Sequence, residues 1–140
     1  MKSHWITLNP RLGDVRPGIK MTLDDVRWFD EEMGIIVTVP AGFCTDGASI
    51  PWPVHLFWKR LDPLTLQASI MHDYGYSCRK KLSIQYGHLD KWKKQSIDRR
   101  FYLGLRAGGC EIGRAKVYHF AVSRFGIFAW IRPNIKEVSE

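Results

Sequence analysis

Apolar and polar positions follow different periodicities in the two halves of the chain. Before residue 62, Val26–Asp30 and Ile35–Val39 are short runs rich in β-branched and aromatic side chains, joined by a polar connection that ends in Gly34. Such runs around a short glycine-containing connection predict a β-hairpin, and His4–Leu8 is a candidate third strand. Residues 40–53 contain two glycines and three prolines. They predict a structured loop, because neither a helix nor a regular central strand tolerates that composition.

After residue 61, apolar positions recur every three or four residues, which predicts three helices. Asp62 and Pro63 are an N-cap and a first helical residue for a helix that extends to about Cys78. A basic, polar connection follows over Arg79–Gln85. The second helix is predicted from about Asp90 to Ala107, ended by two glycines, and the third over roughly Ile112–Phe125.

These elements predict a single α+β domain over residues 1–140. An N-terminal β-hairpin or small antiparallel sheet and a structured loop (1–61) are followed by about three packed helices (62–130) and a tail (131–140). With 140 residues, 45% apolar and 25% charged, the chain is long and apolar enough for a hydrophobic core. No apolar run approaches the roughly 18 residues of a membrane span, and no apolar signal segment follows Met1. Three widely spaced cysteines disfavour a disulfide scaffold or zinc ribbon and suggest a reducing compartment.

Positive charge is concentrated in one segment. The formal net charge is +7, and residues 79–116 contain eleven Lys and Arg against three acids. Such a field attracts nucleic acid, anionic lipid or an acidic protein, although a solvated helix face has the same composition. Trp92 within a lysine cluster is a candidate contact, but helical amphipathicity that turns the indole inward explains it equally well. The candidate partner or nucleic-acid surface comprises Lys91, Trp92, Lys93, Lys94, Arg99 and Arg100.

The strongest candidate for catalysis is the first helix. His72 and Tyr76 are four residues apart and share a helix face, and Asp98 on the next helix would lie beside His72 if the two helices pack antiparallel. A carboxylate that accepts an imidazole N–H fixes the tautomer and stabilises the imidazolium after the ring has taken a proton from water. Alternatively, the same side chains form a structural pin between two helices, without turnover.

Asp73 and the predicted loop supply oxygen donors for a hard cation. Asp46 and Ser49 lie beside glycines that free the loop backbone to turn its carbonyls inward. Two carboxylates with carbonyl oxygens suit Ca²⁺ or another divalent cation, and Asp73 and Asp46 are the candidate metal ligands. Alternatively, the loop is a tight turn whose polar side chains satisfy its own backbone.

Four blocks of sequence resemble an uncharacterised domain family found mostly in tailed bacteriophages and prophages. They are Val39-Pro-x-Gly-x-x-Thr-Asp-Gly-Ala-Ser-Ile-Pro51, His72-Asp-Tyr-x-Tyr76, Ser96-Ile-Asp-Arg-Arg-Phe-Tyr-x-x-Leu-Arg-Ala-Gly108, and Ala115-x-x-Tyr-x-x-Ala-Val122 with Arg124-Phe-Gly126. They occur in order across roughly residues 37–130. The resemblance implies a phage origin and little about chemistry.

The His72-Asp73-x-x-Tyr76 pattern, with an aspartate on the following helix and a glycine-containing loop upstream, is also similar to phospholipase A2. In that family the histidine activates water, the adjacent aspartate binds Ca²⁺ with loop carbonyls, and the aspartate of the next helix orients the histidine. The resemblance implies these roles for His72, Asp73 and Asp98, with Tyr76 supporting the network. The loop here departs from the family's Y-x-G-x-G pattern, and the disulfides of the secreted forms are missing.

Two functional hypotheses follow. The first is a small phage-encoded, metal-assisted hydrolase acting on an ester-like substrate. The second is a non-enzymatic virion component of the tail, neck or baseplate, with other phage structural proteins as partners and a basic interaction surface. A protein that binds a host factor or nucleic acid early in infection ranks below both, because no base-reading motif is present. Each hypothesis places the protein in the host cytoplasm during infection, and the second also in the virion.

Overall fold

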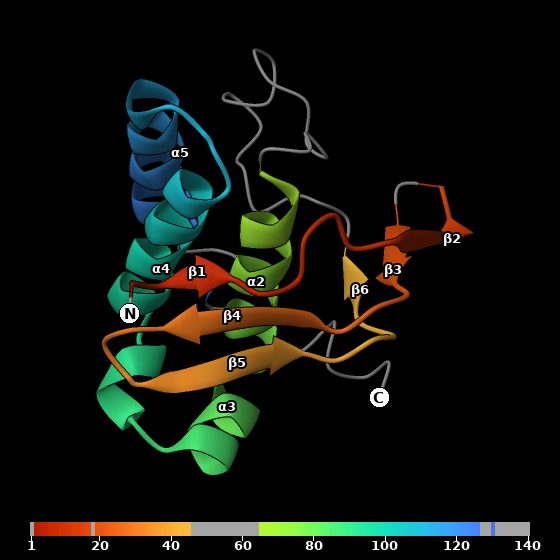
Figure 1. Cartoon of the computed structure of the whole chain (residues 1–140), viewed down its shortest axis with the longest axis horizontal. Coiled ribbons are helices and arrows are strands. Elements are labelled where there is room, and N and C mark those ends of the chain that lie inside the picture. Colours follow the sequence, from red (N-terminus) through yellow and green to blue (C-terminus); the bar gives the residue numbers. More distant parts are fainter. Residues whose placement is uncertain (1, 18, 46–64, 127–129, 131–140) are drawn as a thin grey trace.

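The computed structural model describes residues 2–17, 19–45, 65–126 and 130, and has the α+β architecture predicted from the sequence (Figure 1). Strands occupy the N-terminal part and helices follow. The strands are β1 (His4–Trp5), β2 (Leu12–Arg16), β3 (Ile19–Thr22), β4 (Val26–Asp30), β5 (Ile35–Val39) and β6 (Cys44–Thr45). The helices are α2 (Leu66–Ser77), α3 (Arg79–Tyr86), the 3-10 helix η1 (Leu89–Trp92), α4 (Lys94–Ala107) and α5 (Ile112–Phe125).

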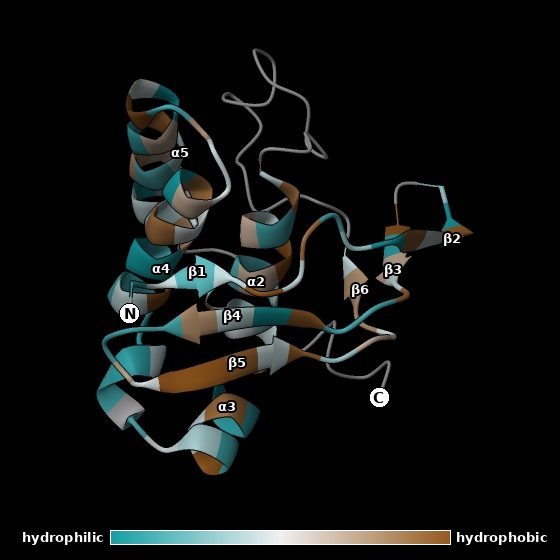
Figure 2. Cartoon of the chain, viewed as in Figure 1, coloured by the Kyte–Doolittle hydropathy of each residue, from teal (hydrophilic) through white to brown (hydrophobic). Residues whose placement is uncertain are grey.

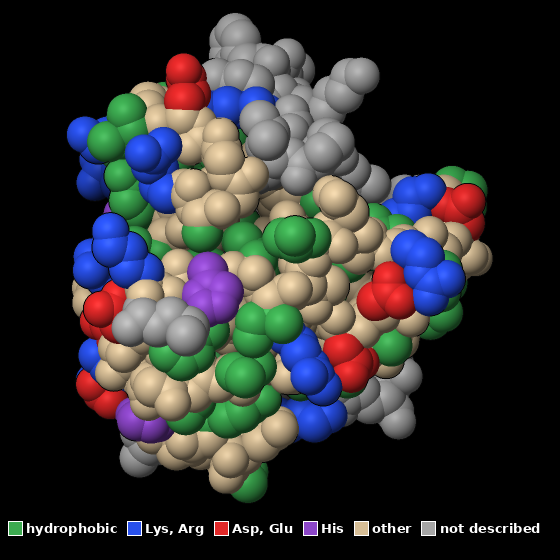
Figure 3. All heavy atoms as spheres, viewed as in Figure 1, with side chains coloured by type: hydrophobic (Ala, Val, Ile, Leu, Met, Phe, Trp, Pro, Cys, Tyr) green, Lys and Arg blue, Asp and Glu red, His purple; other side chains and the backbone are tan. Residues whose placement is uncertain are grey.

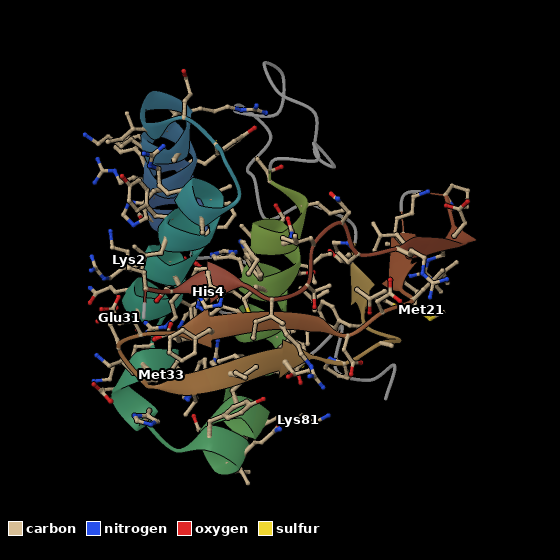
Figure 4. All side chains as sticks on the ribbon, viewed as in Figure 1. Lys2, His4, Met21, Glu31, Met33 and Lys81 are labelled. Atoms are coloured by element: carbon tan, nitrogen blue, oxygen red, sulfur yellow. The ribbon has the colours of Figure 1, made fainter. Side chains whose placement is uncertain are left out.

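The first antiparallel sheet has the order β1-β4-β5 and contains the predicted hairpin with its predicted bounds. Val26 pairs with Val39 and Asp30 pairs with Ile35. Gly34 closes the turn at φ +67°, a conformation that favours glycine. The brown colour of β5 in Figure 2 marks its run of apolar side chains. The predicted third strand is confirmed only over His4–Trp5, which pairs with β4. Figure 4 shows Glu31 and Met33 at the β4–β5 turn and His4 on β1.

A second antiparallel sheet, of order β2-β3-β6, was not predicted. Strand β2 is largely exposed and has no alternation of apolar and polar side chains, so its sequence gives no strand signal. Strand β6 lies within the segment predicted to be a loop, and that prediction is wrong for Cys44 and Thr45, which pair with β3. Residues 40–43 have no regular structure, in agreement with the prediction. The remainder of that segment lies outside the described residues.

Helix α2 is the central element of the helical part. It packs against α4 on one side and against β4 and β5 on another (Figure 1). The sequence predicted a single apolar stripe, whereas ten of its twelve residues are buried, polar ones included. The predicted start at Asp62 and Pro63 lies outside the described residues.

The other helices differ from the prediction mainly between α2 and α4. The predicted connection over Arg79–Gln85 is instead the helix α3, of whose residues Leu82 is buried. One buried position in a charged segment gives no helical period, which explains the wrong prediction. Helix α4 begins at Lys94 rather than about Asp90, because Lys93 has an extended backbone that separates α4 from η1. Helix α5 has the predicted bounds.

One hydrophobic core combines residues of the first sheet and of the helices. Trp5 of β1 reaches α4, where its Nε1 donates a hydrogen bond to the carbonyl oxygen of Gly104 at 2.9 Å. Its ring also lies 4.7 Å, centroid to centroid, from the ring of Trp28. The close approach of an indole to the helix backbone requires a residue without a side chain at position 104. No helix in the described part of the chain is both long and apolar enough to span a bilayer.

Gly104→Ala is therefore expected to lower the free energy of unfolding by about 1–3 kcal/mol, the usual cost of overpacking. The added Cβ would lie 2.9 Å from Cζ2 of Trp5 and 3.3 Å from Cβ of Ala68. Urea-induced unfolding measures the change. Gly113→Ala in α5 is the matched control, because the nearest neighbour of its Cβ would be Oε1 of Glu111 at 3.8 Å. If both variants have the stability of the wild type, the close Trp5 contact is wrong.

Candidate functional site

The carboxylate of Asp98 joins α4 to the face of α2 that carries His72 and Tyr76. Oδ1 of Asp98 lies 2.7 Å from Nε2 of His72 and accepts a hydrogen bond of 2.6 Å from the Tyr76 hydroxyl. The i, i+4 spacing brings the two rings of α2 together, with centroids 4.2 Å apart, and the packing of α4 supplies the acid. The meeting of these three side chains agrees with the arrangement expected from their spacing.

The charge state of this cluster follows from its donors. Burial acts to raise the pKa of Asp98, but the hydrogen bond and charge of His72, with the hydrogen bonds of Lys94 and Tyr76, hold that pKa below its usual value. Burial, and then the hydrogen bond to Asp98, raise the pKa of Tyr76 far above its usual value. Asp98 is therefore an ionised acceptor, and Tyr76 remains a protonated donor.

The ionised carboxylate assigns the tautomer of His72. A carboxylate only accepts hydrogen bonds, so when the ring is neutral it carries its hydrogen on Nε2, and Nδ1 then has the lone pair. The ring of Phe101 lies 4.8 Å from that of His72 and limits its orientation, together with Tyr76. A positioned neutral imidazole whose second nitrogen has a lone pair, with a carboxylate partner at the first, has the chemistry of a general base.

The cluster is enclosed. His72 exposes 3% of its surface and Asp98 exposes 1%. His72 and Phe101 also border an internal cavity of about 20 Å³ between the helices and the first sheet, which is room for one water molecule. A larger molecule therefore reaches His72 only when neighbouring segments move.

Lys94 connects the same carboxylate to the end of α5. Its Nζ lies 2.8 Å from Oδ2 of Asp98 and donates to the carbonyl oxygens of Val122 and Ser123 at 3.1 and 3.2 Å. A cation at the C-terminal carbonyls of a helix is favourable. Asp98 thus also holds α2, α4 and α5 together, which is the contribution expected of a structural pin.

The predicted metal ligands are only partly described. Asp73 is buried in α2, next to His72 in sequence, and Asp46 lies outside the described residues. Across residues 2–17, 19–45, 65–126 and 130, no three or more His, Cys, Asp or Glu side chains gather in a way that could hold a metal ion. Any oxygen donors that complete a site with Asp73 would have to include backbone carbonyls or residues of the segment that contains Asp46.

Comparison with known families matches residues 21–122 to a family described as "Protein of unknown function (DUF1353)". The chain belongs to the DUF1353 family. His72, Asp73, Tyr76 and Asp98 all lie within the matched residues. An uncharacterised protein, y4jT, of Sinorhizobium fredii (strain NBRC 101917 / NGR234) is 31% identical over 117 residues, or 81% of this chain. The chain spans 30% of the length of that relative. No solved structure matches.

The surface predicted for partners of this DUF1353 chain is not continuous. Trp92 exposes 5% of its surface and donates a hydrogen bond from Nε1 to the carbonyl oxygen of Gly87, so its predicted role as a surface contact is wrong. Arg100 is also buried, so its predicted role as a surface contact is wrong as well. The remaining four predicted residues differ in accessibility: Lys93 and Arg99 are exposed, Lys91 is half-buried near Glu32 and Asp90, and Lys94 is turned toward Asp98.

Arg100 belongs to a second buried polar cluster that the sequence analysis missed. Its Nε lies 2.7 Å from Oδ2 of Asp30 in an ion pair, and its Nη2 donates a hydrogen bond to Oδ1 of Asp30 at 3.2 Å. Nε1 of Trp28 and the backbone N–H of Met33 donate to the same carboxylate. In the DUF1353 chain this pair ties the β4–β5 hairpin to α4. The alternation Val26, Trp28, Asp30 places Asp30 on the inward face of β4, and that register was a signal that could have identified it.

Proposed function

We propose that this DUF1353 protein is a small hydrolase in which His72 activates a water molecule for attack on an ester-like carbonyl. The observation that supports it is the contact of Asp98 Oδ1 with Nε2 of His72 and with the Tyr76 hydroxyl. That contact leaves the Nδ1 lone pair of His72 as the only basic position of the ring. Asp98 is a positioning residue, and Tyr76 holds the carboxylate in place.

The proposed reaction uses two proton transfers. Nδ1 of His72 takes a proton from water as the water oxygen forms a bond to the carbonyl carbon, and Asp98 stabilises the resulting imidazolium. The tetrahedral intermediate then expels the leaving-group oxygen, which receives the proton from Nδ1 as the carbon–oxygen bond breaks. The products are a carboxylic acid and an alcohol, and the ring returns to its initial tautomer. Because His72 is enclosed, substrate binding requires neighbouring segments to move.

A divalent cation, with Ca²⁺ as the first candidate, forms part of the proposal. Asp73, together with Asp46 and backbone carbonyls, would hold it, and when bound it would supply electrostatic stabilisation of the developing oxyanion. The support is that Asp73 of α2 is next in sequence to His72, and that the imidazole of His72 already contacts a different acid, Asp98.

Assays of the full chain on phospholipid vesicles, short-chain nitrophenyl esters and cell-wall fragments test this function. Wild-type protein with Ca²⁺ is expected to turn over at least one class. His72→Ala is expected to lower the rate by about 10²- to 10⁴-fold, because the general base is removed. EDTA, and Asp73→Asn, are expected to lower it as well. His88→Asn is the control, since His88 is exposed and Asn tolerates its φ of +53°. Absence of turnover on every substrate, with and without Ca²⁺, would contradict the proposal.

A second candidate is a phage-encoded, non-enzymatic virion component, for which the Asp98 cluster is a structural pin. The order of the four motif blocks supports the phage origin, and α5 supports an interaction role because Ile112, Val117 and Phe120 are exposed apolar side chains. This function places the protein in the host cytoplasm during infection and then in the particle, with other phage structural proteins as partners. Mass spectrometry of purified particles tests it: the protein is expected in stoichiometric amounts, and its absence would contradict this candidate.

A further inference from the structure

A groove with a volume of about 590 Å³ lies between α4 and α5, and Asp98 is one of the residues that line it. His72 does not line it. The two helices contribute side chains from facing positions. The lining residues are Lys94, Gln95, Asp98, Arg99 and Tyr102 of α4, and Lys116, His119 and Ser123 of α5.

The charge of the groove is positive. Three of its lining side chains are cations, and Asp98 is the acid that lines it. The carboxylate of Asp98 is already engaged by His72, Tyr76 and Lys94, so its charge is compensated. Figure 3 shows Lys and Arg side chains along the margin where α4 and α5 lie in Figure 1.

Two of the cations are available to a ligand. Lys94 is held at Asp98 and at the end of α5. Arg99, by contrast, has a side chain that is 62% exposed and has a 3.4 Å contact with Glu32, an exposed pair that contributes little. Lys116 is exposed on the opposite helix, and no acid pairs with it among the described residues. Arg99 and Lys116 therefore line the groove from opposite helices with charges that are not neutralised by a buried partner.

Neutral hydrogen-bonding groups line the groove together with these cations. Burial lowers the pKa of His119, and the charges of Arg99 and Lys94 act in the same direction, whereas that of Asp98 opposes them. His119 is packed edge-on against Tyr102, with ring centroids 5.8 Å apart. Gln95 and Ser123 add an amide and a hydroxyl. A cationic groove with several neutral donors suits an anion with three or more acceptor oxygens.

We propose that the α4–α5 groove binds the phosphate group of a small ligand or of a lipid headgroup. A phosphate presents enough oxygens to engage Arg99, Lys116 and the neutral donors at once, which a single carboxylate does not. Two available cations are too few for a nucleic acid, whose binding depends on neutralising many phosphates along a strand. This site is distinct from the proposed hydrolytic one, because His72 does not line the groove.

Calorimetric titration of the full chain with inorganic phosphate and with glycerol 3-phosphate, at constant ionic strength, tests the site. Sedimentation with phosphatidylcholine vesicles, with and without phosphatidylglycerol, tests the headgroup. The Arg99→Gln/Lys116→Gln double variant is expected to weaken binding by about tenfold or more, since each exposed charge pair contributes up to about fivefold. Lys80→Gln, at an exposed lysine of α3, is the matched control and should bind as the wild type does.

Saturable binding of the soluble phosphates identifies a free ligand, and binding only to the anionic vesicles identifies a headgroup. Either supports the proposal if the double variant loses it. In the wild type, the ring resonances of His119 should shift with the same saturation curve. In the double variant, the same resonances should be present but should not shift, which separates the loss of anion binding from a loss of folding. No saturable binding to any of these probes, or equal binding by wild type and the double variant, would overturn the proposal. Each result is independent of whether the protein has hydrolase activity.

Discussion

Arg100→Met is expected to lower the free energy of unfolding by about 3–5 kcal/mol, the usual cost of leaving one partner of a buried ion pair. The substitution retains much of the packing volume of the side chain but leaves the Asp30 carboxylate buried with its hydrogen bonds from Trp28 and Met33 and no cation. Because Asp30 belongs to the β4–β5 hairpin and Arg100 to α4, the loss would weaken the contact between the sheet and the helices. Urea-induced unfolding followed by tryptophan fluorescence measures it.

Arg99→Met is the matched control for this prediction. Arg99 is the preceding residue of α4, and its pair with Glu32 is exposed, so the expected change is below about 1 kcal/mol. Asp30→Asn combined with Arg100→Met should recover part of the loss, because it removes the unpaired charge. If Arg100→Met is no more destabilising than Arg99→Met, Asp30 and Arg100 do not form the buried pair described here.

Asp98→Asn is expected to lower turnover more than Tyr76→Phe does. The amide preserves the shape of the side chain but removes the charge that fixes the His72 tautomer and stabilises the imidazolium. The expected loss in kcat is about 10²- to 10⁴-fold, with little change in KM. Tyr76→Phe is the control, because it removes one hydrogen bond to Asp98 and keeps the ring beside His72, so its loss should be smaller. Equal activity of Asp98→Asn and wild type would contradict the proposed role of the carboxylate.

The same substitution has a pH-dependent effect on stability. The pKa of Asp98 is lower in the folded protein than its ordinary value of 3.8. The carboxylate therefore stabilises the fold fully above about pH 4–5, and that stabilisation is lost as the pH falls through the lowered folded pKa. At pH 7 Asp98→Asn should be less stable than wild type by about 1–3 kcal/mol, the contribution of a hydrogen bond to a charged group. The difference should narrow progressively in acid.

Elements with a strong local period could be predicted from the sequence. The β4–β5 hairpin and α5 have alternating or helical apolar positions and clear ends, and their bounds are as predicted. The meeting of His72, Tyr76 and Asp98 could also be predicted, because the i, i+4 spacing fixes two of these side chains on one face and only one helix packing was needed to add the third.

Features that depend on distant parts of the chain could not be predicted in the same way. Strand β2 has no alternation and is defined by its pairing with β3, and α3 buries only Leu82. The lysines beside Trp92 in the sequence predict a basic surface contact, whereas η1 turns Trp92 into the core. Local composition indicates which residues are near each other along the chain, but burial follows from tertiary packing.

The proposed general base has one requirement that can be measured without a substrate: neutral His72 must carry its hydrogen on Nε2. A long-range ¹H–¹⁵N spectrum of the labelled protein, assigned with His72→Gln, reports which ring nitrogen is protonated. The expected result is a protonated Nε2 and an unprotonated Nδ1 in the neutral ring, with Asp98→Ala reducing that preference. A hydrogen on Nδ1 of neutral His72 in the wild type would remove the free lone pair, and with it the chemistry proposed for this protein.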